Sequence, residues 1–224
     1  MQERRIREEP QSAPLLLSLY KDYLKHRTLQ VYARRVESHY SPATLERMAK
    51  TGDCQCRRAA VIALGLLGDY ESNPIMGAAL LDADRGVRRA AEKGIPQVWQ
   101  RMGSQKQRTV LRTIIQLNQQ GHCMDALSLA SELIEQAPWF AEVWNQRARA
   151  YYERKFYTDS IRDCCRTLEL NPFHFESAVR MGHSHVELDD LISALDCYHK
   201  ALKINANLEG VRAKVIYLRK SLGD

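Results

Sequence analysis

Hydrophobic residues recur along this chain at spacings of three and four, which is the pattern of α-helices with one buried face. In the amino-terminal part Leu16, Tyr20 and Leu24 follow this spacing, and residues 15–40 are expected to form one or two helices. Glycine and proline, at 11 and 7 residues, are too few for a β-sandwich with a turn after every short strand. The sequence therefore predicts an all-α protein.

A period of 34 residues organises the carboxyl-terminal half. Pro138 and Pro172 lie one period apart, and small residues recur at the same interval at Ala126, Ser160 and Ala194. Proline ends a helix because the residue before it disfavours the α conformation, and a small residue lets two helices cross closely. Each period therefore predicts a helix, a short turn and a second helix. The three units are residues 107–140, 141–174 and 175–208.

These units resemble the tetratricopeptide repeat. The middle unit carries Trp144, Ala148 and Tyr151 at the positions of that motif, the third keeps Gly182 and Tyr198, and the first matches least well. The resemblance covers about half of the chain. It implies that the helix pairs stack into a superhelix whose concave face binds partners.

A second period, of 31 residues, appears upstream: segment 53–65 aligns with segment 84–95. Between the two segments Asn73-Pro74 predicts the start of a further helix. The aligned pattern resembles the HEAT-like repeat, which also occurs in phycobilisome-lyase-type repeat proteins. The matched residues are Asp53 with Asp84, Arg57-Arg58 with Arg88-Arg89, and Ala59-Ala60 with Ala90-Ala91.

Together the two repeats predict an α-α superhelix, a right-handed helical-repeat solenoid built from HEAT-like and tetratricopeptide helix pairs. The link at Gly103-Ser104 is short, so we expect one continuous solenoid rather than two tethered bodies. The expected division is a mobile tail at residues 1–14, amino-terminal helices with two HEAT-like repeats at 15–103, and three tetratricopeptide units with a capping helix at 104–224.

The tetratricopeptide resemblance also selects residues for the concave groove, because fixed positions on the first helix of each unit face it. The arginines among them can pair bidentately with carboxylates, which favours an acidic or carboxylate-ended peptide as the ligand. The competing interpretation is an ordinary polar face in contact with water. The candidates are Arg112, Asn118, Gln119, Asn145, Gln146, Arg149, Tyr152, Arg180 and His183.

Some members of this family hold the terminal carboxylate of a chaperone with a clamp of two lysines, two asparagines and one arginine. Of that set only Arg180 is present here. Leu111, Ile115 and Glu176 occupy three clamp positions, and Gln146 replaces an asparagine. Capture of a chaperone tail is therefore not expected.

The composition narrows the class of protein. Hydrophobic residues at 45% and charged residues at 27% exclude a disordered chain, and no apolar run approaches the length of a membrane span. The amino terminus has arginines without an apolar stretch behind them, so no secretory signal is expected. The six cysteines do not form the framework of a secreted protein. We expect a cytoplasmic protein with reduced thiols and no membrane contact.

Charge is unevenly distributed along the chain. Residues 1–108 carry 19 Lys and Arg against 12 Asp and Glu, a balance of +7, whereas residues 109–224 carry 14 against 15. A basic half keeps nucleic acid open as a partner. In the HEAT-like pattern, however, the arginine after the valine commonly pairs with an aspartate, which would give Arg57 and Arg88 a structural role.

Signals for catalysis and metal binding are weak. His183 and His185 would point about 200° apart around a helix, and Cys54 and Cys56 lack a second cysteine pair at zinc-site spacing. No phosphate-binding loop, dinucleotide glycine pattern or nucleophile elbow occurs. We therefore predict no enzyme activity, no cofactor and no metal. The predicted function is a non-catalytic scaffold for a protein or peptide partner; the alternatives are a nucleic-acid-associated adaptor and an accessory subunit related to lyase-type repeat proteins.

Overall fold

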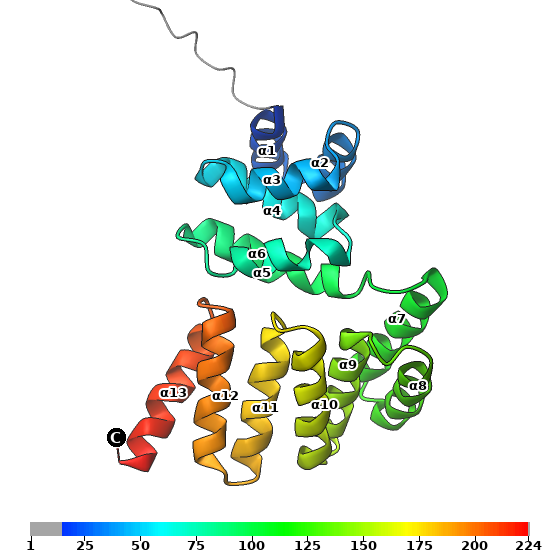
Figure 1. Cartoon of the computed structure of the whole chain (residues 1–224), viewed down its shortest axis with the longest axis vertical. Helices are drawn as coiled ribbons and strands as arrows, with labels where there is room; N and C mark the ends of the chain where they lie inside the picture. Colours follow the sequence, from blue (N-terminus) through cyan, green and yellow to red (C-terminus); the bar gives the residue numbers. More distant parts are fainter. Residues whose placement is uncertain (1–14, 224) are drawn as a thin grey trace, which may run out of the picture.

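The computed structural model describes residues 15–223, and the tail expected at residues 1–14 lies outside them. The described chain is all-α, as predicted: it has thirteen α-helices and one short 3-10 helix, and no strand occurs in this part of the chain. Figure 1 shows two groups of helices that run in different directions, one on residues 15–99 and the other on residues 105–222.

The first group is called the amino-terminal module below. Its helices are α1 (Leu15–His26), α2 (Leu29–Glu37), α3 (Pro42–Thr51), α4 (Cys54–Leu67), α5 (Asn73–Ala79) and α6 (Arg85–Trp99), with the 3-10 helix Tyr70–Ser72 before α5. Ser41 caps α3, because its side chain accepts a hydrogen bond from the backbone N–H of Thr44. Asp53 and Asp84 cap α4 and α6, because their carboxylates accept hydrogen bonds from the backbone N–H of Cys56 and Val87 at 2.8 and 2.9 Å. The upstream period therefore reflects two helices with the same start signal.

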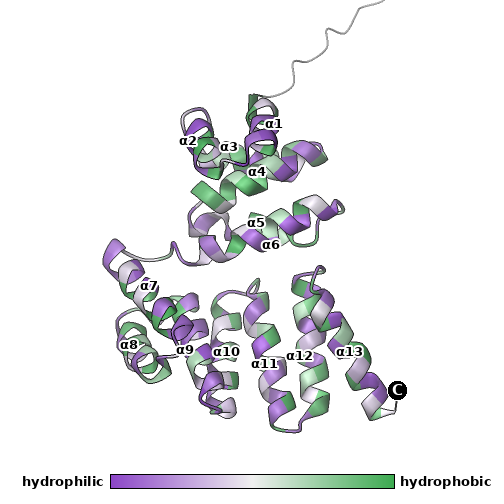
Figure 2. Ribbon diagram, turned by 180° about the vertical axis from the view of Figure 1, so that it is seen from behind, coloured by the Kyte–Doolittle hydropathy of each residue, from purple (hydrophilic) through white to green (hydrophobic). Residues whose placement is uncertain are grey.

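Helix α4 lies at the centre of the amino-terminal module. Helices α1, α2, α3, α5 and α6 all contact it, and Figure 2 shows that it is hydrophobic along much of its length. Gly65 of α4 and Gly94 of α6 approach so closely that a Cβ atom on Gly65 would lie 2.8 Å from the Cα of Gly94. Ala59, Leu64 and Trp99 belong to the buried core around this crossing.

The second group is called the repeat module. Its helices are α7 (Gln105–Gln119), α8 (Cys123–Gln136), α9 (Ala141–Glu153), α10 (Tyr157–Leu170), α11 (Phe175–Glu187), α12 (Leu191–Ile204) and α13 (Glu209–Leu222). Ala126, Ser160 and Ala194 are fully buried on the second helix of each pair. Consecutive helices contact one another in order from α7 to α13, so the pairs stack side by side as a solenoid (Figure 1).

The two modules meet at the turns that precede α11 and α13, so the amino-terminal module lies across the ends of the repeat helices (Figure 1). The Trp99 ring stacks on the His174 ring with centroids 4.0 Å apart. Asn73 donates a hydrogen bond to Asn171 at 3.0 Å, and Phe175 is part of the same buried cluster as Trp99. The hydrophobic core of the amino-terminal module therefore extends into the repeat module.

This arrangement corrects the expectation of one unbroken row of helices through Gly103-Ser104. Helix α6 packs on α4 and α5, whereas α7 packs on α8 and α9, so the row is interrupted at that link. The physical reason lies in the aromatic residues of the turn before α11. The ring of Phe173 packs directly against Gly77. A Cβ atom added to this glycine would lie only 2.2 Å from the ring. Aromatic side chains bury large apolar areas, and here their burial holds the module across the helix ends.

The predicted pairing of Arg57 is confirmed, because it donates two hydrogen bonds to the carboxylate of Asp82 at 2.7 and 2.8 Å. Arg88 behaves differently. It donates to the backbone carbonyls of Asp82 and Ala83 and to the side chain of Asn207 in the repeat module. Arg88, which aligns with Arg57 in the 31-residue period, thus helps to join the two modules.

Candidate functional site

The first helices of the repeats border a hollow on one side of the solenoid, which we call the repeat groove. It is a cavity of about 360 Å³ with charged, aromatic and aliphatic side chains on its walls. The lining residues are Arg149, Tyr152 and Glu153 of α9, Phe175, Glu176, Val179, Arg180 and His183 of α11, and Leu208 and Val211 at the start of α13. Four of the nine predicted groove residues therefore line one cavity.

Two arginines on adjacent helices face this cavity. The guanidinium of Arg180 donates a hydrogen bond to the side-chain oxygen of Asn145, which fixes its position on the groove wall. The guanidinium of Arg149 has no hydrogen bond or ion pair with any residue between 15 and 223. Guanidinium donors pair well with carboxylates. The groove can therefore hold a carboxylate between α9 and α11.

Glu176 lies beside the two arginines and is half-buried. Burial raises the pKa of Glu176; the facing His174 opposes this rise, and the carboxylate of Glu142 adds to it. Glu176 therefore takes up a proton more readily than an ordinary glutamate. In the protonated form its carboxyl group can donate a hydrogen bond to an acidic ligand.

His183 lies between two tyrosine rings, with centroid distances of 6.3 Å to Tyr152 and 5.6 Å to Tyr198. Burial, together with the nearby charges of Lys214 and Arg180, lowers the pKa of His183 to about 4. The imidazole is therefore neutral at pH 7. Its buried Nε2 atom has no hydrogen-bond partner among the described residues, and such an atom is costly to leave unpaired.

Three of the predicted groove residues, Asn118, Asn145 and Gln146, are buried between successive repeats. The Asn118 amide donates to the backbone carbonyl of Gln146 at 2.9 Å. The amides of Asn145 and Gln146 donate to the carboxylate of Glu142 at 3.1 and 2.7 Å. The side-chain amide nitrogens of all three residues are thus occupied, that of Asn118 by the next repeat and those of Asn145 and Gln146 by Glu142 of their own helix. The remaining two, Arg112 and Gln119, are exposed on α7 and do not line the repeat groove.

The carboxylate of Glu142 forms the centre of this buried network, and its partner is His174. The His174 Nδ1 accepts a hydrogen bond from the backbone N–H of Ser177 at 3.3 Å, so its proton lies on Nε2, 2.9 Å from Glu142. Burial raises the pKa of Glu142, but hydrogen bonds from His174, Gln146 and Asn145 outweigh it and hold that pKa below its usual range. One feature of the sequence could have pointed to His174: it lies between Phe173 and Phe175, two residues after Pro172.

Within residues 15–223, no three His, Cys, Asp or Glu side chains lie close enough together to hold a metal ion. Over the same residues, none of the helices combines the length and the hydropathy that crossing a bilayer requires.

Parts of the chain are similar to parts of known proteins. No family model matches it. The "WD and tetratricopeptide repeats protein 1" of Mus musculus is 35% identical over 75 residues, which cover 32% of this chain and 11% of that protein. The "Hsp70-Hsp90 organizing protein" of Triticum aestivum is 30% identical over 101 residues, which cover 45% of this chain and 16% of that protein. The chain thus matches only a small part of each relative.

Solved structures establish the fold. The first tetratricopeptide domain of Spaghetti (RPAP3), bound to the HSP90 peptide SRMEEVD, superposes with a TM-score of 0.52 at 20% identity and covers 55% of this chain and 97% of that one. The first such domain of human RPAP3 superposes with a TM-score of 0.50 at 19% identity, covering 52% of this chain and 92% of that one. About half of the chain therefore has the fold of these tetratricopeptide domains.

Proposed function

We propose that this protein is a non-catalytic adaptor that binds a short acidic segment of a partner protein in the repeat groove. One observation carries the proposal: Arg149, which has no internal partner among the described residues, lies with Arg180 beside aliphatic walls. A carboxylate between the two guanidiniums gains charge-assisted hydrogen bonds. The side chains of Val179, Leu208 and Val211 can accept an aliphatic residue next to it.

The acidic peptide SRMEEVD on a tetratricopeptide domain of the same fold supports this class of ligand. The mode of recognition that we propose differs from a clamp on a chaperone's terminal carboxylate. At two clamp positions Leu111 is fully buried and Ile115 is half-buried and apolar, and at a third Glu176 would repel a carboxylate when it is ionised. Arg149 and Arg180 would instead bind acidic side chains within a segment.

We also propose that α3–α6 form two HEAT-like helix pairs. The equivalent caps Asp53 and Asp84 and the ion pair of Arg57 with Asp82 support this interpretation. A cytoplasmic location is part of the same proposal. The cysteines of the described chain are free thiols, which is compatible with a reducing compartment.

The alternative of a nucleic-acid-associated adaptor has less support. Arg57 and Arg58 are bonded to aspartates, and Arg88 and Arg101 donate mainly to backbone carbonyls. These guanidiniums already have partners, so a phosphate would have to compete for them. The second alternative, an accessory subunit related to lyase-type proteins, stays a prediction without a supporting contact.

Selection from a peptide library displayed on phage tests the proposed function, with the full chain immobilised. We expect the enriched peptides to carry Asp or Glu close to an aliphatic residue. Synthetic copies of the enriched peptides should bind the Arg149→Glu variant about ten- to a hundredfold more weakly than the unchanged protein, because a hydrogen bond to a charged group contributes about 1.5–3 kcal/mol.

The matched control is Arg162→Glu, which makes the same charge change on the exposed side of α10. It should bind the selected peptides as the unchanged protein does. Two results would count against the repeat groove: enrichment without acidic residues, or equal loss of binding in the Arg149 variant and the control.

A further inference from the structure

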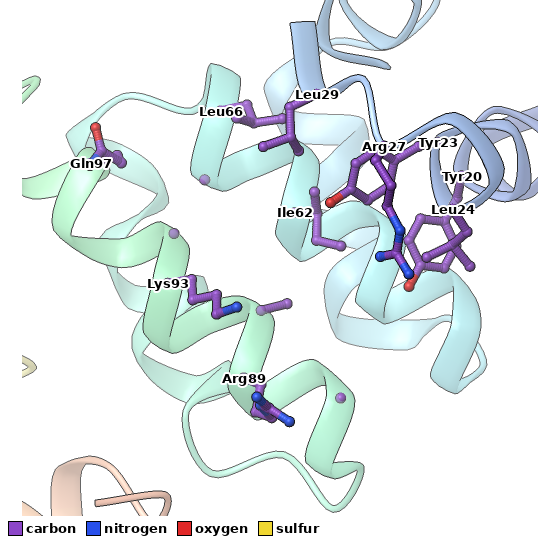
Figure 3. A pocket seen from close by; sticks show the side chains of 14 residues that line it. Tyr20, Tyr23, Leu24, Arg27, Leu29, Ile62, Leu66, Arg89, Lys93 and Gln97 are labelled. Carbon is purple, nitrogen blue, oxygen red and sulfur yellow. The ribbon is translucent and has the colours of Figure 1, made fainter. Parts of the chain in front are cut away.

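We propose that the amino-terminal module carries a second docking site, a groove over helix α4 that takes an acidic amphipathic helix of a partner protein. Figure 3 shows this α4 groove: α1 and the α1–α2 connection form one wall, α6 forms the other, and α4 forms the floor. The cavity measures about 390 Å³. It belongs to a different module from the repeat groove and shares no lining residue with it.

The shape of the α4 groove suits a helix. On α6 the lining residues run from Gly86 to Gln97 and recur every three or four positions, so this wall is about 16 Å long, or three helical turns. On α4 the floor has Ile62 and Leu66, one turn apart. Between them Gly65 contributes no side chain, because α4 and α6 cross there in close contact. The result is a hollow bounded by about three turns of α6, with an apolar floor.

The walls of this groove expose apolar side chains that the module leaves uncovered. Leu24 and Leu29 are 41% and 42% exposed, and both line the groove. Exposed aliphatic residues that gather around a hollow are typical of surfaces that bind another protein. An amphipathic helix would bury these leucines together with the floor residues of α4.

The charge of the groove selects the partner. Arg27 lies on one wall, Arg89 and Lys93 lie on the other, and no lining residue is acidic. All three are exposed, and none forms a side-chain hydrogen bond or an ion pair with a residue of the described chain. Most other arginines of this region, such as Arg57 and Arg101, are bonded internally. A helix with acidic residues on both sides of an apolar stripe complements two basic rims around an apolar floor.

Nucleic acid fits this surface less well. Phosphates form a continuous charged chain and need basic groups along their path. Here the basic groups lie on opposite walls, and the surface between them is apolar, with Leu24 on one wall and Leu66 on the floor. A protein helix can satisfy both parts at once, and we therefore infer a protein partner.

Fluorescence anisotropy with the full chain tests the proposal. The probe is a labelled, amidated peptide of about four helical turns with leucine at i, i+3, i+4 and i+7 and glutamate on both sides of that stripe. We expect Arg89→Glu with Lys93→Glu to weaken binding at least about tenfold, and Leu24→Glu to do the same. The matched control, Arg34→Glu with Lys50→Glu, makes the same charge change on α2 and α3 away from the groove. It should change the affinity less than about twofold, as should Arg149→Glu in the repeat groove.

Three results would overturn the proposal. The first is equal weakening by the groove variant and its matched control, which would mean non-specific charge attraction. The second is equal binding of a probe that carries lysine in place of glutamate. The third is that the Arg89→Glu with Lys93→Glu variant loses binding of a duplex DNA but binds the peptide as the unchanged protein does. This result would identify the groove as a nucleic-acid surface. Circular dichroism of each variant verifies that it is folded. Because Arg149→Glu leaves this groove intact, failure of the peptide proposal for the repeat groove is distinguishable from failure here.

Discussion

The indole of Trp99 stacks on the imidazole of His174, with ring centroids 4.0 Å apart and planes inclined by 23°. The indole also donates a hydrogen bond to the side-chain oxygen of Asn73 at 2.9 Å, and the imidazole donates to Glu142. One stacked pair thus connects α6 of the amino-terminal module with α9 of the repeat module through buried groups. We expect the two modules to unfold together.

The first prediction concerns this stacked pair. Trp99→Ala should lower the free energy of unfolding by about 3–5 kcal/mol, because it removes a fully buried aromatic side chain and leaves a cavity. It should also split a single urea transition, followed by circular dichroism, into two. Trp139→Ala is the control: Trp139 is 42% exposed, and we expect its loss to cost less than about 1 kcal/mol. Equal losses in the two variants would contradict the role of Trp99 as the connection.

The second prediction concerns the pH dependence of stability. Because the native pKa of Glu142 lies below the usual glutamate range, its carboxylate stabilises the fold at neutral pH. This contribution is lost as the pH falls from about 5 through the lower native pKa, where the carboxylate is finally protonated. Glu142→Gln should therefore reduce the free energy of unfolding at pH 7 by about 1–3 kcal/mol and flatten its decrease as the pH falls below about 5.

Urea denaturation at a series of pH values measures this effect. Glu135→Gln, which changes an exposed glutamate of α8, is the matched control and should keep the pH dependence of the unchanged protein. If Glu142→Gln were as pH-dependent as the control, the acid sensitivity would arise elsewhere, for example at Asp82, whose pKa is lowered by its bond to Arg57.

The helix pairs of the repeat module could be predicted because their signals recur. Small residues at Ala126, Ser160 and Ala194 mark the same helix crossing three times, and each crossing is a local contact within one pair. The alignment of Asp53 with Asp84 was visible in the same way, and the structure shows that both residues cap a helix. A period in the sequence arises from contacts that every repeat makes, and it therefore predicts the stacking of the helix pairs in the repeat module.

The junction of the modules could not be predicted, because it depends on residues that occur only once. The turn before α11 buries Phe173 and His174 against α5 and α6, and no second turn repeats this sequence. The polar character of Asn145 and Gln146 likewise did not reveal that these two residues are buried. Both occupy positions that face a groove in the repeat pattern, but their partner is the buried carboxylate of Glu142 rather than water.

The third prediction concerns Gly182 on α11. A Cβ atom at this position would lie 2.5 Å from the ring of the buried Tyr198, so Gly182→Ala forces α11 and α12 apart. We expect a loss of about 1–3 kcal/mol in the free energy of unfolding, measured by urea denaturation. Gly210→Ala is the control, since nothing lies within 4 Å of its Cβ position in α13. Alanine favours helix there, and the change should be neutral or stabilise by up to about 1 kcal/mol. A neutral Gly182→Ala would show that the repeat contact is looser than described.

The fourth prediction uses His183 as a reporter for the repeat groove. In the free protein its imidazole should titrate with a midpoint near pH 4, because burial and the charges of Lys214 and Arg180 disfavour the protonated form. Lys214→Gln removes one of these charges and should raise the midpoint, which NMR of the imidazole measures directly. An acidic peptide bound at Arg149 and Arg180 adds negative charge beside the ring, so saturation with such a peptide should raise the midpoint as well. In Arg149→Glu the same peptide concentration should produce a smaller shift. If the peptide left the midpoint of the unmodified protein unchanged, the ligand would bind outside this cavity. If the midpoint of the free protein lay near the ordinary histidine range, the ring would be open to water.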